Sequence, residues 1–136
     1  MDLENIIHPG MQREEVFTIE EQNTAIHVGS GSSRVLATPW MIAFMERASH
    51  HLLVEHLPEG YTSVGVHVDV RHLAPTPVGY SIRVRSDIQE VNGQHVTFAV
   101  SAWDNQEQVG TGLHQRYVID EARFLKRVEA KRSSQT

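Results

Sequence analysis

The sequence predicts an α+β fold in which an antiparallel sheet of five or six strands wraps around one long helix. Three observations predict it. An apolar run at residues 35–46, opened by a Thr-Pro pair, indicates the start of a helix. Residues 61–119 show the alternation of half-buried strands, joined mostly by hairpin signals. Helix and strands are therefore segregated along the chain, which is typical of the α+β class.

The chain ahead of the helix is predicted to be short and mostly extended. Residues 1–12 form an irregular lead-in that contains a Pro-Gly turn signal. A strand covers residues 15–20, and residues 25–28 are expected to form a second extended piece. The Gly- and Ser-rich segment 29–33 is predicted to be a flexible linker or lid that leads into the helix.

The helix is predicted to start with Thr38 at the N-cap, where its hydroxyl accepts a backbone N–H, and with Pro39 at the first helical position. It is expected to end at about His56, because Pro58 and Gly60 stop it. Its first two turns are apolar on every side, which indicates a helix that is buried all round. A curved sheet wrapped around the helix would supply that cover, and this arrangement is called the hotdog fold.

The strand that follows the helix is predicted over residues 61–73. Valines at positions 64, 66, 68 and 70 alternate with polar residues, and the same period places His72 on the apolar face. Two prolines in residues 74–79 end the strand, since proline lacks the N–H that a central strand donates.

The remaining chain is predicted to form a meander of strands and a terminal helix. A strand that begins at Tyr80 reaches the hairpin signal Asn92-Gly93 and returns over residues 94–103. After a second turn, the last strand covers residues 108–119. A short amphipathic helix is expected from about 120 to 130, followed by a polar, frayed tail.

Composition limits the classes of protein to consider. The chain has 136 residues, 40% of them apolar and 21% charged, as in a soluble globular domain. Its net charge of −5 argues against a general nucleic-acid binder. The absence of cysteine excludes disulfides, a thiol nucleophile and thiolate metal ligands. The acidic N-terminus does not look like a signal peptide, and no apolar run reaches the length of a membrane span. We therefore expect a cytoplasmic protein without nucleic-acid or membrane partners.

Three segments together carry a family resemblance. Residues 35–41 lead to Glu46, residues 72–79 have the pattern His-x-Ala-x-Thr-Pro-x-Gly, and residues 110–116 lie on the last strand. Over about residues 10–128 of a single domain, 1–136, this resembles the hotdog-fold acyl-CoA thioesterases, specifically the fluoroacetyl-CoA thioesterase-like family. The resemblance implies an acyl-CoA substrate and a homodimer or dimer of dimers whose subunits pair edge to edge.

The resemblance also implies the roles of particular residues. Thr38, Glu46 and His72 match the catalytic positions of the family, and Gly65 and Arg116 match its substrate-binding positions. The enzymes specific for fluoroacetyl-CoA carry bulky aromatic residues ahead of the helix, whereas residues 29–33 contain none. We therefore expect thioester hydrolysis of acyl groups larger than acetyl.

The residue types suit that chemistry. Glu46 is a general base for water or a nucleophile, and the sequence leaves both mechanisms open. Thr38 would orient or polarise the attacking group, and His72 would shuttle a proton or polarise the carbonyl. His114 shares the predicted strand face of Arg116 and joins it as a substrate-binding candidate. No metal and no cofactor is predicted, because the histidines lack a ligand set with suitable spacing.

Each candidate residue also has a purely structural interpretation. Glu46 would pair with His50 in solvent, Thr38 would only cap the helix, and His72 would only anchor the following loop. Gly65 would form a bulge. Arg116 would form a cross-strand ion pair with an aspartate, either residue 69 or residue 87.

Two other functions remain possible on the same fold. One is an acyl-thioester dehydratase or hydratase, although Asp69 precedes His72 by three residues and not by the five that some hydratases use. The other is a non-catalytic acyl-CoA binding module, which loss of Glu46 or His72 would favour. Because both residues are present, the sequence favours hydrolysis; fold analogy alone does not decide.

Overall fold

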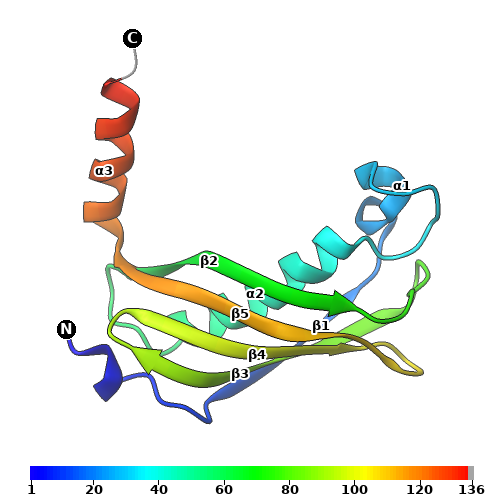
Figure 1. The fold of residues 1–136 in the computed structure, drawn as a ribbon, viewed down its shortest axis with the longest axis horizontal. Helices are drawn as coiled ribbons and strands as arrows, with labels where there is room; N and C mark the ends of the chain where they lie inside the picture. Colours follow the sequence, from blue (N-terminus) through cyan, green and yellow to red (C-terminus); the bar gives the residue numbers. More distant parts are fainter. Residues whose placement is uncertain (135–136) are drawn as a thin grey trace.

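The structure is a computed structural model that describes residues 1–134, and it has one antiparallel sheet with a long helix packed on it (Figure 1). The strands are β1 (Gln12–Thr18), β2 (Tyr61–His72), β3 (Ser81–Asn92), β4 (His95–Trp103) and β5 (Gln108–Asp120), in the spatial order β1-β3-β4-β5-β2. The helices are α1 (Ala25–Val28), α2 (Thr38–Val54) and α3 (Glu121–Ser133), with 3-10 turns η1 (Leu3–Asn5) and η2 (Glu21–Asn23). The predicted α+β class and antiparallel sheet are confirmed, with five strands.

Helix α2 packs one of its sides against the sheet (Figure 1). The apolar side chains that it buries are Met41, Phe44, Met45, Ala48, Leu52 and Leu53. They meet buried side chains of the strands, among them Ile82, Val84, Ile88, Val96, Phe98 and Val100. The prediction that the first two turns are buried all round is not met, because Ile42 and Ala43 stay half-buried. One sheet covers one side of a helix, so the side that Ile42 shares with Glu46 remains partly open in a single chain.

The start of helix α2 differs from the prediction by one residue. Ala37 is the N-cap, Thr38 is the first helical residue, and no side chain makes a capping hydrogen bond. The predicted capping role of Thr38 is therefore wrong, because its hydroxyl is used elsewhere. The helix ends at Val54, two residues before the predicted end at His56.

Residues 25–28 form helix α1 instead of the predicted extended piece. Thr24 caps this short helix by accepting the backbone N–H of His27 at 3.3 Å, and Gly29 ends it with a φ of 88°. The backbone N–H of Ala25 donates to the carbonyl of Val35, which closes the intervening segment into a loop. The predicted linker at residues 29–33 therefore lies in a loop whose ends are tied together beside the start of α2.

Strand β2 contains a bulge that the alternating pattern did not predict. Its register against β5 shifts between Gly65 and His67. Directly opposed residues of an antiparallel pair point to the same face. Gly65, ahead of the bulge, opposes the buried Arg116, and Val68, after it, opposes the buried His114. Odd-numbered positions ahead of the bulge and even-numbered positions after it therefore share the face toward α2.

The placement of all four β2 valines on one face is consequently wrong. Val64 opposes Tyr117 on the outer face, whereas Val70 opposes Gly112 on the inner face. His72 does lie on the same face as Val70, as predicted. The reason is that a bulge adds one unpaired residue and reverses the alternation of period two.

Strand β2 is also an unpaired edge of the sheet, and β1 is the other edge. Val66 is 51% exposed and Val68 is 38% exposed. An edge strand offers free backbone N–H and C=O groups, which proteins usually cover or pair. The strand that carries Gly65 and His72 is therefore open for pairing with another chain.

Helix α3 projects from the end of β5, away from the sheet (Figure 1). Asp120 caps it by accepting the backbone N–H of Arg123 at 3.2 Å, and the helix continues to Ser133, beyond the predicted end near residue 130. Only part of the predicted polar tail can be assessed, because residues 135–136 lie outside the described residues. Within residues 1–134, no helix has the length and apolar character needed to cross a membrane.

Candidate functional site

Thr38 and His72 meet at the N-terminal end of helix α2. Oγ1 of Thr38 lies 2.7 Å from Nδ1 of His72, within hydrogen-bond distance. The helix supplies Thr38, and the last residue of β2 supplies His72. The same Thr38 hydroxyl that was predicted to cap the helix is instead the partner of a ring nitrogen.

The position of His72 is fixed by the loop that follows it. Leu36, just ahead of α2, donates its N–H to the carbonyl of Thr76 at 2.8 Å, and the side chain of Thr76 donates to Oδ2 of Asp104 at 3.1 Å. These bonds tie the loop to the start of α2 and to the turn between β4 and β5. Thr76 therefore anchors this loop, while the ring of His72 lies against Thr38 and the backbone of Ala74.

Burial lowers the pKa of His72, and the backbone of Ala74 partly offsets that effect. Its Nε2 is buried and makes no hydrogen bond of good geometry with the described residues. A hollow of about 320 Å³ opens beside Thr38 and His72. Its other lining residues are Ala25, Ser30, Val35, Leu36, Ala37 and Pro75, all of them small or aliphatic. A neutral imidazole thus lies next to a hydroxyl at the wall of an accessible hollow.

A second cluster surrounds Gly65 on the inner face of β2. A Cβ placed on Gly65 would lie 2.9 Å from Oε2 of Glu46, 3.3 Å from Nη1 of Arg116 and 3.4 Å from Cε1 of His114. The absence of a Cβ at Gly65 therefore allows the carboxylate of Glu46 to approach the strand this closely. The predicted bulge is therefore present beside Gly65, at the point where Glu46 comes close to the strand.

Arg116 is buried, with 7% of its surface exposed. Its Nη1 donates to Nε2 of His114 at 3.1 Å, because a guanidinium only donates. His114 therefore carries its proton on Nδ1, which donates to the carbonyl of His67 at 2.8 Å. Burial lowers the pKa of Arg116 and the carboxylate of Glu46 opposes this, so the guanidinium stays protonated at neutral pH.

Two structural interpretations from the sequence are wrong. Within residues 1–134, Arg116 forms no ion pair with an aspartate, since Asp87 pairs with Arg85 at 3.0 Å. Glu46 does not pair with His50, whose Nδ1 lies 2.8 Å from Oγ of Ser63. The carboxylate of Glu46 instead faces the Gly65 cluster.

One chain does not bring all the predicted catalytic residues together. Thr38 and Glu46 are eight positions apart on α2, which is about 12 Å along the helix axis. Gly65 and His72 are separated by roughly 20 Å along β2. The Thr38–His72 pair and the Glu46 cluster are therefore two distinct sites within a protomer.

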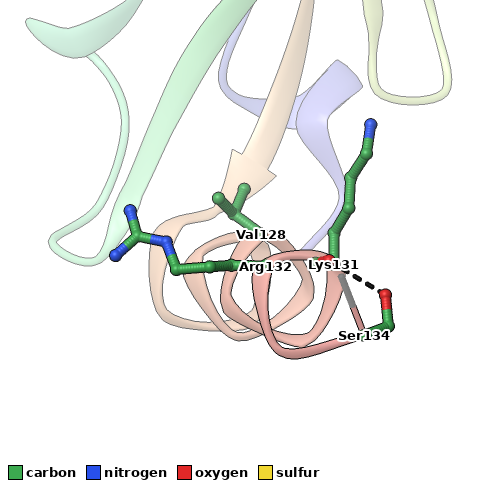
Figure 2. A pocket seen from close by; sticks show the side chains of 4 residues that line it. All are labelled: Val128, Lys131, Arg132 and Ser134. Atoms are coloured by element: carbon green, nitrogen blue, oxygen red, sulfur yellow. Dashed lines mark hydrogen bonds between the residues drawn. The ribbon is translucent and has the colours of Figure 1, made fainter. Parts of the chain in front are cut away.

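Two other surface hollows contain none of the predicted site residues. Figure 2 shows one on α3, lined by Val128, Lys131, Arg132 and Ser134, with Ser134 Oγ donating to the carbonyl of Lys131 at 2.9 Å. Among residues 1–134, no three His, Asp or Glu side chains are arranged to hold a metal ion. The predicted site residues therefore gather at two places on the inner face of β2, around Gly65 and at His72.

Sequence reasoning missed two members of the Gly65 cluster. Ser63 is buried, and its Oγ accepts from Nε of Arg116 at 2.8 Å. His50 contacts the same hydroxyl. Spacing in the sequence could have identified both residues. Ser63 lies two positions before Gly65, on the same face of the strand, and His50 lies four positions after Glu46, on the same face of the helix.

A long helix packed on one antiparallel sheet is the arrangement of the hotdog fold that the sequence predicted. Residues 19–122 match the family model of the fluoroacetyl-CoA-specific thioesterase FlK. The chain therefore belongs to the fluoroacetyl-CoA-specific thioesterase family, and the assignment made from its motifs is confirmed.

Individual relatives agree with this assignment. The fluoroacetyl-CoA thioesterase of Streptantibioticus cattleyicolor is 34% identical over 97 residues, which cover 71% of this chain and 70% of that protein. The structure of fluoroacetyl-CoA thioesterase FlK matches with a TM-score of 0.87 and 27% identity, over 96% of this chain and 98% of that one. A hot-dog-like protein from Thermanaerovibrio acidaminovorans matches with a TM-score of 0.88 and 27% identity, over 96% and 97%. The predicted hotdog fold is thereby confirmed.

Three histidines, the buried His114 and the half-buried His50 and His72, predict how stability depends on pH. Burial is the largest cause that lowers the pKa of His50, His72 and His114 below the ordinary 6.5, and Arg116 lowers it further for His50 and His114. Below pH 6.5 the unfolded chain then binds more protons than the folded one, so the free energy of unfolding falls as pH falls. We expect NMR titration midpoints below 6.5 for these rings. A midpoint at or above 6.5 for His114 would contradict the prediction.

Proposed function

We propose that this protein hydrolyses the thioester of small-to-medium acyl-CoA molecules to the free acid and CoA. The observation that carries the proposal is the coexistence of the Thr38–His72 hydrogen bond with a carboxylate, Glu46, that faces a buried cation across Gly65. These groups supply a hydroxyl, a neutral proton carrier, and a base or nucleophile. Membership of a thioesterase family supports the same reaction.

His72 and Thr38 act at the thioester in this proposal. A neutral imidazole can take a proton from the Thr38 hydroxyl or pass one through it, and the lowered pKa of His72 keeps the ring neutral at pH 7. Thr38 thus orients the attacking group or the carbonyl through one hydroxyl. The Thr38–His72 pair also delivers a proton to the departing sulfur of CoA when that sulfur needs one.

Glu46 supplies either a general base for water or a nucleophile that forms an anhydride with the acyl group. Single-turnover hydrolysis in ¹⁸O-labelled water distinguishes direct attack by water from an anhydride that is opened at its glutamyl carbonyl. Direct attack by water puts the label into the product acid in the first turnover. Attack by Glu46 leaves a carboxylate oxygen of the enzyme in the product when water then attacks the glutamyl carbonyl.

We further propose that the working site is shared between two protomers. Reacting groups must lie about 3–3.5 Å from one carbonyl, and the two clusters of one chain are too far apart for that. Gly65 and His72 both face inward on the unpaired strand β2. An antiparallel pairing of two β2 strands, with the two-fold axis midway between these positions, sets Gly65 of one protomer opposite His72 of the partner subunit.

This homodimer also covers surface that a single chain leaves open. It pairs the backbone groups of the β2 edge and shields Val66 and Val68 from water. It brings cover to the half-buried side of α2 that carries Ile42 and Glu46. A dimer of dimers would repeat the same pairing.

Subunit complementation tests the shared site. Co-expressed chains that carry Glu46→Gln or His72→Ala form mixed dimers in which one of two shared sites keeps both native residues. We expect such mixtures to recover roughly a quarter of wild-type activity, given random pairing of subunits and independent sites. Each variant alone is the control for residual activity.

No recovery in mixed dimers that are shown to form would place Glu46 and His72 of each site in one chain. Light scattering at micromolar concentration supplies the companion measurement, and a monomeric mass would refute the dimer itself. Val66→Lys on β2 is expected to weaken dimers. The matched control is Val16→Lys, a change at an exposed valine on the opposite edge strand β1.

Acyl size is predicted from the hollow beside Thr38. Its lining residues Ala25, Ser30 and Ala37 are small, and no aromatic side chain narrows it. A free-thiol release assay over short, branched, aromatic and long acyl-CoAs is the most direct test of the proposed function. We expect turnover of acyl groups larger than acetyl. Turnover of two-carbon acyl-CoAs alone would show that this interpretation of the entrance is wrong, and absence of thiol release from every ester would reject hydrolysis.

A further inference from the structure

Ser63 lies at the centre of a buried hydrogen-bond network beside the Gly65 cluster. Only 6% of its surface is exposed. Its Oγ accepts from Nε of Arg116 at 2.8 Å, and its backbone carbonyl accepts from Nη2 of the same guanidinium at 3.2 Å. Nδ1 of His50 lies 2.8 Å from the Ser63 Oγ. One serine thus holds two sides of the cation and contacts a histidine on α2.

The direction of each hydrogen bond follows from Arg116. A guanidinium has five N–H donors and no acceptor, so the Ser63 Oγ must accept from Nε. The hydroxyl proton of Ser63 is then free to be donated to Nδ1 of His50. When the Ser63 hydroxyl donates to Nδ1, a neutral His50 carries its own proton on Nε2. The same logic places the proton of His114 on Nδ1.

The bonds to Ser63 and His114 use three of the five N–H groups of Arg116 and fix the plane of the guanidinium. They leave Nη1 at 3.3 Å from the point where a Cβ on Gly65 would lie, with Oε2 of Glu46 at 2.9 Å from that point. The position of the cation relative to the carboxylate therefore depends on His114, which borders this gap, and on Ser63, which does not border it.

We propose that Ser63 and His50 are positioning residues, which act on the thioester site by orienting Arg116 beside Glu46. This inference rests on the proposed hydrolysis. Ser63 anchors Nε and Nη2, and His50 anchors the Ser63 hydroxyl from the opposite side. In this network, Nδ1 of His50 accepts from the Ser63 hydroxyl and Nε2 of His114 accepts from Arg116.

A double-mutant cycle separates positioning from a general structural role. Ser63→Ala leaves Nε of Arg116 without its acceptor, and we expect kcat/KM to fall between about tenfold and about 100-fold, the scale of a misplaced site group. In an Arg116→Met background, the same Ser63→Ala change is expected to alter kcat/KM by less than about twofold, because the effect passes through Arg116. Ser63→Thr keeps the hydroxyl and is expected to retain most of the activity.

A neighbouring hydroxyl provides the matched control. Thr62 is adjacent to Ser63 and faces the other side of the sheet opposite Ile119, so Thr62→Ala is expected to leave kcat/KM unchanged. His50→Phe keeps a ring but removes the acceptor, and its effect is also expected to vanish in the Arg116→Met background. If circular dichroism shows that Ser63→Ala does not fold, His50→Phe still tests the proposal.

Nitrogen-15 NMR of the histidine rings supplies a readout that does not need activity. The network requires opposite neutral tautomers, with the proton on Nε2 in His50 and on Nδ1 in His114. The same tautomer in both rings would overturn the network, and additive effects in the cycle would overturn the positioning role while leaving hydrolysis intact. A folded wild-type protein that releases no thiol would reject the proposed function, and the positioning role with it, even if the tautomers are opposite.

Discussion

Replacing Glu46 by glutamine is expected to lower kcat for acyl-CoA hydrolysis by roughly 100-fold or more, the usual scale for a positioned base. The change keeps the shape of the side chain and removes its basicity and its nucleophilic charge. Steady-state thiol release and circular dichroism measure activity and folding on the same sample. The cluster around Gly65 predicts that the effect falls on the chemical step, because Oε2 of Glu46 borders the gap between the strand and Arg116.

The matched control is Glu59→Gln, which neutralises an exposed carboxylate in the turn after α2. We expect that variant to keep wild-type kcat, since its carboxylate is remote from both clusters. Near-wild-type hydrolysis by folded Glu46→Gln would remove Glu46 from the mechanism. A purely electrostatic role toward Arg116 would then be its remaining function.

Replacing His72 by alanine is expected to lower kcat by roughly 100-fold or more, because it removes the proton carrier that contacts Thr38. Thr38→Ala should cost less, since water can take the place of a hydroxyl, and Thr38→Ser should retain much of the activity. The double variant Glu46→Gln with His72→Ala is expected to be little worse than the worse single variant, because groups that act as one unit are non-additive. Multiplicative losses would instead assign the two residues to independent steps.

The structure changes the expected stability effect at Thr38. A lost N-cap would cost about 1 kcal/mol, but Thr38 makes no capping bond. The relevant loss is its hydrogen bond to His72, and a bond of that kind contributes about 1 kcal/mol. Thr38→Ala and His72→Ala should therefore destabilise non-additively in urea unfolding, whereas a capping role would give independent effects.

The family resemblance placed Arg116 among the substrate-binding positions. Its side chain is buried on the inner face of the sheet and borders Gly65. We therefore expect changes at Arg116 to act on the acyl site and on kcat, and not only on KM. The alternating pattern of a strand predicts which face of the sheet a residue lies on, whereas the burial of that residue depends on what packs against the face.

The sequence by itself determined the main elements and the family. The apolar run that leads into α2, the alternation along β3 to β5, and the Asn92-Gly93 turn are local patterns, and Gly93 has the φ of 62° that such turns require. The three segments that include Thr38, Glu46 and His72 were sufficient for the family assignment, which the family model confirms. These features depend on residues a few positions apart, so a single sequence contains them.

The tertiary structure decided which residues meet. The bulge at Gly65 reverses the face of every later residue of β2, and it lies where Glu46 from α2 and Arg116 from β5 crowd the strand. Ser63 joins the cluster because its strand position happens to oppose Val118, next to that cation. The partner of the Thr38 hydroxyl is likewise 34 residues away in sequence. Contacts between distant segments depend on the packing of several elements at once, and no local pattern of hydrophobicity or turn propensity specifies them.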